Sequence, residues 1–170
     1  VAIRPNLIIF NWPADEQEKS EVANSLCNVS KLGRSVAILR TTGIVQENIW
    51  QVPPGKIDVW WLGQSNGSLM VLLAHLLTTN NQWRGRKIRL IRMIKDQAGK
   101  DKTAEYLSEL AVSARIAVEP TVIVGDNFEQ CLQEESVSSA LCILGLPDPQ
   151  ELEEGIWDSL SKQAGEIPRV

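Results

Sequence analysis

The segment KIDVWWLGQSNGSLMVLLAHLL, from Lys56 to Leu77, decides how the chain folds. Its first part, residues 57–62, is a nearly continuous run of β-branched and aromatic side chains, typical of a strand covered on both faces. Glycine and small polar residues follow from Gly63 to Gly67 and predict a tight turn. Helical periodicity begins at Leu69. The segment therefore predicts a buried strand, a turn and an apolar helix.

The predicted helix carries more apolar surface than one contact needs. Its inward stripe consists of leucines at helical spacing, namely Leu69, Leu72, Leu73, Leu76 and Leu77. At roughly 100° per residue the stripe continues through Met70 and Ala74, which widens the apolar arc to about 200°. Two explanations remain open: other helices of the same domain cover the additional surface, or a protein partner does. The residues predicted for a partner interface are Met70, Ala74 and Leu77.

Length and composition indicate one ordinary globular domain of 170 residues, with 44% apolar and 22% charged residues. The net charge of -4 argues against nucleic acid as a partner. The three cysteines show no C-x-x-C spacing and the chain has a single histidine, so we expect neither a metal site nor a cofactor. No apolar stretch approaches the ~20 residues of a membrane span. Because the chain lacks a starting Met and ends in a strand-like IPRV, we expect residues 1–170 to be a fragment of a larger protein.

Strands alternate with helices along the chain, except that a long loop at 41–55 separates two of the predicted strands. The predicted strands are 6–11, 35–40, 57–62, 86–93, 116–124 and 141–146, and the predicted helices are 13–33, 69–77, 100–114, 127–135 and 149–165. Pro120 lies inside one strand and predicts an edge position for it. This order favours an α/β fold with three layers, in which helices cover both faces of a mainly parallel sheet. The fold is expected to be Rossmann-like, or similar to universal stress proteins.

The turn at 63–67 matches the G-x-S-x-G motif of serine hydrolases, between a strand and a helix. That motif requires an acid and then a histidine later in the chain. Here the single histidine, His75, lies in the helix that follows the turn, so Ser65 has no partner in the required order. We therefore expect no catalytic residues and no enzymatic activity.

The same turn could hold a phosphate, because backbone N–H groups at a helix N-terminus attract anions. The dinucleotide and Walker patterns are both absent, however. Nucleotide binding is thus the alternative function, as in a stress-protein-like sensor. Its residues would be Gly63, Ser65, Asn66, Gly67 and Ser68.

Basic residues are concentrated just after the helix. The residues in question are Arg84, Arg86, Lys87, Arg89 and Arg92, followed by Lys95. Two interpretations remain open: a solvated strand and loop, or a docking patch for an acidic partner or anionic lipid headgroups.

Several blocks resemble the cytosolic C-terminal domain of cation–chloride cotransporters. They are IDVWW at 57–61, the Leu76–Leu77 helix end, Trp83–Arg84, the KIR at 87–89, RPNL at 4–7, NWP at 11–13, LGLPDP at 144–149 and the final IPRV. The opening blocks resemble the potassium–chloride branch most, and the compactness of the chain resembles prokaryotic members. The turn departs from the family pattern, since it lacks the usual acidic residue and paired glycines.

The resemblance implies a regulatory and dimerisation domain on the cytoplasmic face of the cell membrane. Members of the family move chloride together with K⁺ or Na⁺ and serve ion and cell-volume homeostasis. The implied partners are a second copy of this domain and the membrane domain of the same transporter. Residues that bind transported ions would lie outside this chain.

Overall fold

The described strands and helices follow one another in the predicted order, and residues 42–51 of the predicted loop lie outside the described residues. The computed structural model describes residues 6–41, 52–62, 66–149 and 155–170. Its elements are β1 (Leu7–Asn11), α1 (Glu16–Lys31), β2 (Ser35–Leu39), β3 (Ile57–Trp60), α2 (Gly67–Thr79), β4 (Ile88–Ile94), α3 (Lys100–Ala114), β5 (Glu119–Val124), α4 (Phe128–Ser136), β6 (Leu141–Ile143) and α5 (Ile156–Ala164). The last helix starts later than predicted, and residues 150–154 of the predicted helix lie outside the described ranges. No helix in those ranges combines the length and hydropathy that crossing a bilayer requires.

Four strands form one parallel sheet in the order β5-β4-β3-β6. Strand β5 lies at its edge, where Pro120 is paired with Leu90 of β4, so the edge prediction is confirmed. Strands β1 and β2 form a separate parallel pair. The predicted α/β fold with a mainly parallel sheet is therefore correct.

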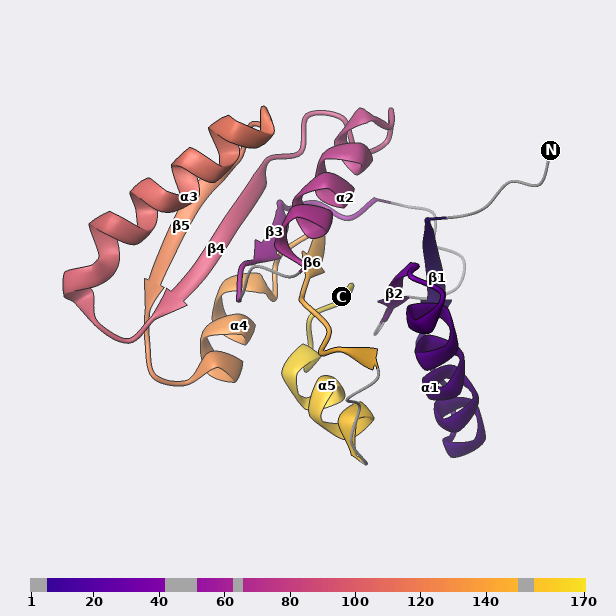
Figure 1. Ribbon diagram of the computed structural model, residues 1–170. Coiled ribbons are helices and arrows are strands. Elements are labelled where there is room, and N and C mark those ends of the chain that lie inside the picture. Colours follow the sequence, from indigo (N-terminus) through magenta and orange to yellow (C-terminus); the bar gives the residue numbers. More distant parts are fainter. Residues whose placement is uncertain (1–5, 42–51, 63–65, 150–154) are drawn as a thin grey trace.

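The C-terminal residues join the two sheets. Arg40, just after β2, exchanges backbone hydrogen bonds of 2.8 and 3.0 Å with Val170. On the other side, the backbone N–H of Cys142 in β6 donates to the carbonyl of Arg169 at 2.9 Å. The C-terminus consequently lies between β2 and β6 (Figure 1). The final IPRV thus forms no strand of its own, but its last two residues connect the two sheets through these backbone hydrogen bonds and an isolated bridge between Arg169 and Thr41.

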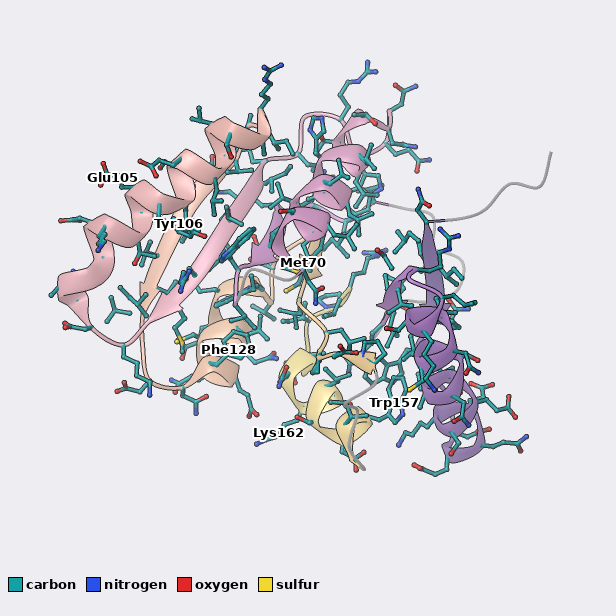
Figure 2. All side chains as sticks on the ribbon, in the orientation of Figure 1. Met70, Glu105, Tyr106, Phe128, Trp157 and Lys162 are labelled. Atoms are coloured by element: carbon teal, nitrogen blue, oxygen red, sulfur yellow. The ribbon has the colours of Figure 1, made fainter. Side chains whose placement is uncertain are left out.

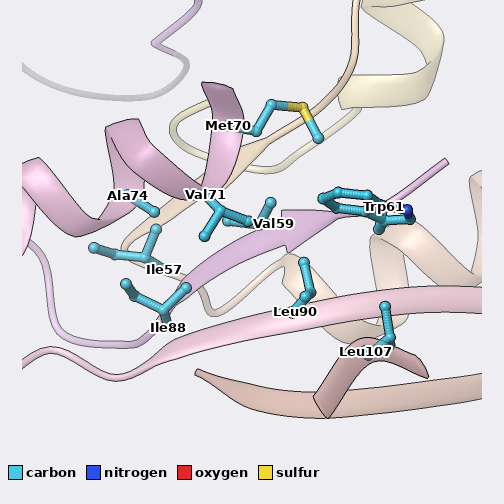
Figure 3. Packing of buried hydrophobic residues seen from close by; sticks show 9 residues of the cluster. All are labelled: Ile57, Val59, Trp61, Met70, Val71, Ala74, Ile88, Leu90 and Leu107. Atoms are coloured by element: carbon cyan, nitrogen blue, oxygen red, sulfur yellow. The ribbon is translucent and has the colours of Figure 1, made fainter. Parts of the chain in front are cut away.

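Helices cover both faces of the four-stranded sheet (Figure 1). Helices α2 and α3 pack on one face, where Ile57, Val59 and Trp61 join the core (Figure 3). On the opposite face Trp60 packs against Phe128 of α4, with 5.3 Å between ring centroids. Alternate residues of the IDVWW block thus supply apolar side chains to both layers, because successive strand residues point to opposite faces.

Candidate functional site

A buried ion pair lies at the centre of the IDVWW block. Asp58 is fully buried (0% exposed), and Arg89 of the neighbouring strand β4 donates two hydrogen bonds to its carboxylate. Arg89 Nε donates to Oδ1 and Nη2 donates to Oδ2, both at 2.7 Å. These hydrogen bonds raise the pKa of the Arg89 guanidinium above its ordinary value. A buried carboxylate is tolerated only with such partners.

Helix α4 completes this network from the other side of the strands. Ser136 Oγ donates to Asp58 Oδ2 at 2.8 Å and accepts from Trp60 Nε1 at 2.9 Å. Arg89 also donates to the carboxylate of Glu135 at 3.1 Å and to its backbone carbonyl at 2.8 Å. Each oxygen of Asp58 thus accepts at least one hydrogen bond. The network ties β3, β4 and the end of α4 together.

Sequence reasoning missed this network, although a signal for it exists. Asp58 is the single acid in one apolar strand and stands beside Arg89 in the next strand. The prediction that Arg89 belongs to a docking patch is therefore wrong. Its side chain is only 17% exposed and is paired within the fold.

The other predicted basic residues separate in space. The guanidinium carbon of Arg92 lies 6.0 Å from the ring centroid of Tyr106, a residue of α3 (Figure 2). Lys95 follows the carboxyl end of β4, whereas Arg84, Arg86 and Lys87 precede its amino end. The guanidinium of Arg86 donates to the carbonyl of Gly55 at 3.1 Å, whereas Arg84 is exposed.

Lys87 is exposed and pairs with Glu119 at 2.7 Å, while Lys56 holds the other oxygen of that carboxylate at 2.8 Å. Hydrogen bonds from Lys56, which has the larger effect, and from Lys87 lower the pKa of Glu119 to about 2. Of the predicted basic residues, Arg84, Arg86 and Lys87 therefore lie together before β4, whereas Arg89, Arg92 and Lys95 lie elsewhere.

Helix α2 is rotated relative to its prediction. Met70 and Ala74 are buried in the core together with Val71, so these two proposed interface residues are not available to a partner (Figure 3). Leu77 is partly buried against the same core. The physical reason is the lack of a side chain at Gly67, since the ring of Trp61 occupies the space that a Cβ atom would need there. That close approach turns the face of Gly67, Met70, Val71 and Ala74 toward the sheet.

This rotation leaves leucines on the outside of α2. Leu72 is 46% exposed and Leu76 is 53% exposed, and the half-buried Leu69 and Leu73 adjoin them. We call Leu72 and Leu76 the leucine ridge. The excess apolar arc predicted from the sequence therefore exists, although different residues form it.

The predicted nucleotide site is only partly described. Gly63 and Ser65 lie outside the described residues. The side-chain amide of Asn66 donates to the carbonyl of Leu146 at 2.9 Å, Gly67 is covered by Trp61, and Ser68 is exposed. Asn66 and Gly67 thus serve the packing of the start of α2.

A depression of about 280 Å³ adjoins the turn. Its lining residues are Leu62, Asn66, Gly67, Met70, Gly145, Leu146 and Pro147. It lies beyond the carboxyl ends of β3 and β6, the place where open α/β sheets bind ligands. Among the described residues that line it, none has a charged side chain that could pair with a phosphate. Among the described residues, no three Cys, His, Asp or Glu side chains are grouped to hold a metal ion.

Comparisons with known proteins agree with this architecture. Potassium/chloride cotransporter 3 of Caenorhabditis elegans is 25% identical over 122 residues, which cover 68% of this chain and 11% of that protein. A crystal structure of the cytoplasmic domain of a prokaryotic cation chloride cotransporter matches with a TM-score of 0.72 and 17% identity. That match covers 96% of this chain and 61% of the other, and at this identity it establishes the fold.

The sequence model of solute carrier family 12 covers residues 11–138, from the last residue of β1 to just beyond α4. This range contains the IDVWW strand, the ion pair between Asp58 and Arg89, and the leucine ridge. It is well over half of the chain. The chain therefore belongs to solute carrier family 12.

Proposed function

We propose that this chain is a non-enzymatic, cytoplasmic regulatory and dimerisation domain of a cation–chloride cotransporter. Family membership and the fold shared with a cytoplasmic cotransporter domain support this proposal. In this proposal, residues 1–170 are one domain of a longer protein. Chloride moves with K⁺ or Na⁺ through membrane helices outside the chain, and association of the domains biases the transporter among its conformations.

The leucine ridge on α2 carries the dimerisation part of the proposal. Leu72 and Leu76 lie one helical turn apart on a helix whose opposite face is buried in the core. A C₂ contact would use the ridge of both copies, so four half-exposed leucines would leave water together. Each contributes about 0.7–1.5 kcal/mol, because complete burial of a leucine is worth about 1.5–3 kcal/mol. The four together then supply about 3–6 kcal/mol, or about 10²–10⁴ in the dissociation constant.

Sedimentation velocity tests the proposal with a double variant, Leu72→Glu with Leu76→Glu. We expect the unmodified chain to dimerise and the variant to remain monomeric at the same concentration. Val112→Glu is the matched control, because Val112 is 78% exposed on α3 and should leave the dimer intact. A monomeric unmodified chain, or a variant that still dimerises, would contradict the proposal.

Nucleotide sensing remains the second candidate because of the depression beyond β3 and β6. Its position suits a ligand, whereas the described residues of its lining are uncharged and offer little to a phosphate chain. Calorimetry with ATP and AMP separates the two functions. Saturable nucleotide binding that Gly145→Trp abolishes would favour the sensor.

A further inference from the structure

The four-stranded sheet has a basic edge. The connections that enter the amino ends of its strands are residues 52–56 before β3, 80–87 before β4, 115–118 before β5 and 137–140 before β6. Their charged residues are all cations, namely Lys56, Arg84, Arg86, Lys87 and Arg115, which we call the amino-edge cations. Parallel strands bring these connections to one edge of the sheet. Glu119, the first residue of β5, is the acid that lies among them.

The opposite edge of the same sheet has the reverse charge. The described residues after the carboxyl ends of β4, β5 and β6 include Lys95, Asp96, Asp126 and Asp148 before the next helix begins. Five cations and Glu119 give a formal +4 at the amino edge, whereas one cation and three acids give -2 at the carboxyl edge. The chain as a whole carries -4. The positive charge is thus concentrated at one edge.

Compensation of helix dipoles does not account for all of this charge. Helices α2, α3 and α4 end at the basic edge, and each C-terminus is equivalent to roughly -0.5 charge. Subtracting all three from +4 leaves roughly +2.5. Two further acids, Glu134 and Glu135, lie at the end of α4, and Glu135 is already paired with Arg89. An excess of positive charge therefore remains at the amino edge.

The amino-edge cations form a row. Strands β5, β4 and β3 are neighbours, so the three connections that supply the cations lie side by side, about 4.8 Å apart per strand. Arg84 and Arg115 are exposed, and neither guanidinium has a hydrogen bond or ion pair with the described part of the chain. The depression at the turn lies at the opposite edge of the sheet. A row of long cationic side chains suits a flat anionic surface better than an enclosed small molecule.

We propose that the amino-edge cations dock this domain onto an anionic lipid surface through headgroup phosphates and carboxylates. This inference rests on the proposed function, which places the domain beside a membrane. Glu119 acts as an internal competitor, because its two oxygens hold Lys56 and Lys87 at 2.8 and 2.7 Å as a headgroup would. Replacing Glu119 therefore strengthens docking, which a merely structural cluster would not predict.

Co-sedimentation of the full chain with vesicles of phosphatidylcholine and phosphatidylserine tests the proposal. We expect binding that disappears on pure phosphatidylcholine and weakens with added salt. Each cation near an anionic surface changes the partition coefficient roughly fivefold. The double variant Arg84→Gln with Arg115→Asn should therefore bind roughly 25-fold more weakly. Asparagine suits position 115, where φ is 57°, because its side chain tolerates this left-handed conformation.

The matched control removes two cations from the opposite end of the fold. Lys100→Gln with Lys102→Gln changes the net charge equally, at exposed positions where α3 begins. This control should change binding less than roughly twofold, because its charges lie away from the docking edge. Glu119→Gln should bind roughly fivefold more tightly than the unmodified chain.

Equal losses in the two double variants, or no preference for phosphatidylserine, would refute the proposal. Tighter binding to polyglutamate than to the vesicles would instead identify an acidic protein segment as the partner. Saturable binding of inorganic phosphate in calorimetry, without vesicle binding, would identify a free anion. These outcomes leave the dimerisation test untouched, because the leucine ridge carries none of the substitutions. Failure of docking and failure of the proposed function can therefore be told apart.

Discussion

Replacing Arg89 by methionine should destabilise the fold more than any change at an exposed arginine. Methionine keeps much of the apolar stem and removes both hydrogen bonds of 2.7 Å to the fully buried carboxylate of Asp58. Among the described residues, Ser136 then remains as the one hydrogen-bond partner of that carboxylate. The change therefore leaves an uncompensated charge inside the protein, and it also removes the bonds to Glu135.

Breaking a buried ion pair from one side costs about 3–5 kcal/mol. Domains have about 5–15 kcal/mol of unfolding free energy in total, so this loss is a large part of the whole. For a chain of this size, 1 kcal/mol shifts the melting temperature by about 2–4 °C, and the expected fall is about 6–20 °C. Arg84→Met is the control, because Arg84 is exposed and should change stability by no more than about 0.5 kcal/mol.

Urea unfolding followed by tryptophan fluorescence measures these values, since Trp60 belongs to the network. The double variant Asp58→Leu with Arg89→Met removes both charges. It should be more stable than Arg89→Met alone by about 2 kcal/mol or more, because the buried charge is gone. The reasoning fails if Arg89→Met costs less than about 1 kcal/mol, or if the double variant is no more stable than the single one.

Two further predictions concern Gly67, which packs against Trp61, and Glu119 at the basic edge of the sheet. Gly67→Ala should cost about 1–3 kcal/mol of unfolding free energy, because its methyl group would meet the ring of Trp61; a urea midpoint equal to that of the unmodified chain would contradict this packing. Because the pKa of Glu119 is lowered from 4.5 to about 2, the stabilisation from Lys56 and Lys87 should be present above pH 4.5 and be lost as the pH falls toward 2. The difference in melting temperature between the unmodified chain and Glu119→Gln should shrink over that range, more so at low salt, and a constant difference would exclude the effect.

The local pattern of residues was enough to predict most elements and the fold class. Apolar runs bounded by turn residues located the strands, and Pro120 placed β5 at the edge because it lacks an N–H to donate. The alternation of strands with helices indicated a parallel sheet, which the strand pairing confirms. These features depend on periodicity and on backbone chemistry, which act within a few residues.

Which face of α2 packs on the sheet was decided by tertiary contacts. Hydrophobicity ranks the leucines above Ala74 and Gly67, so the sequence pattern predicted that the leucines face inward. The close approach of Trp61 to Gly67 reverses this order, since a small residue lets the helix come near the strand. Shape complementarity across the sheet is not visible in the periodicity of one helix.

By itself, then, the sequence determined the order of strands and helices, the α/β class and the resemblance to cotransporter domains. Only the tertiary structure decided that Arg89 forms an ion pair with Asp58 and that Leu72 and Leu76 face outward. It also decided that Arg115 and Arg84 lie at the same edge of the sheet. The physical reason is range. Secondary structure follows from neighbours along the chain, whereas a charge or a leucine acquires its role from residues that only the folded sheet brings beside it.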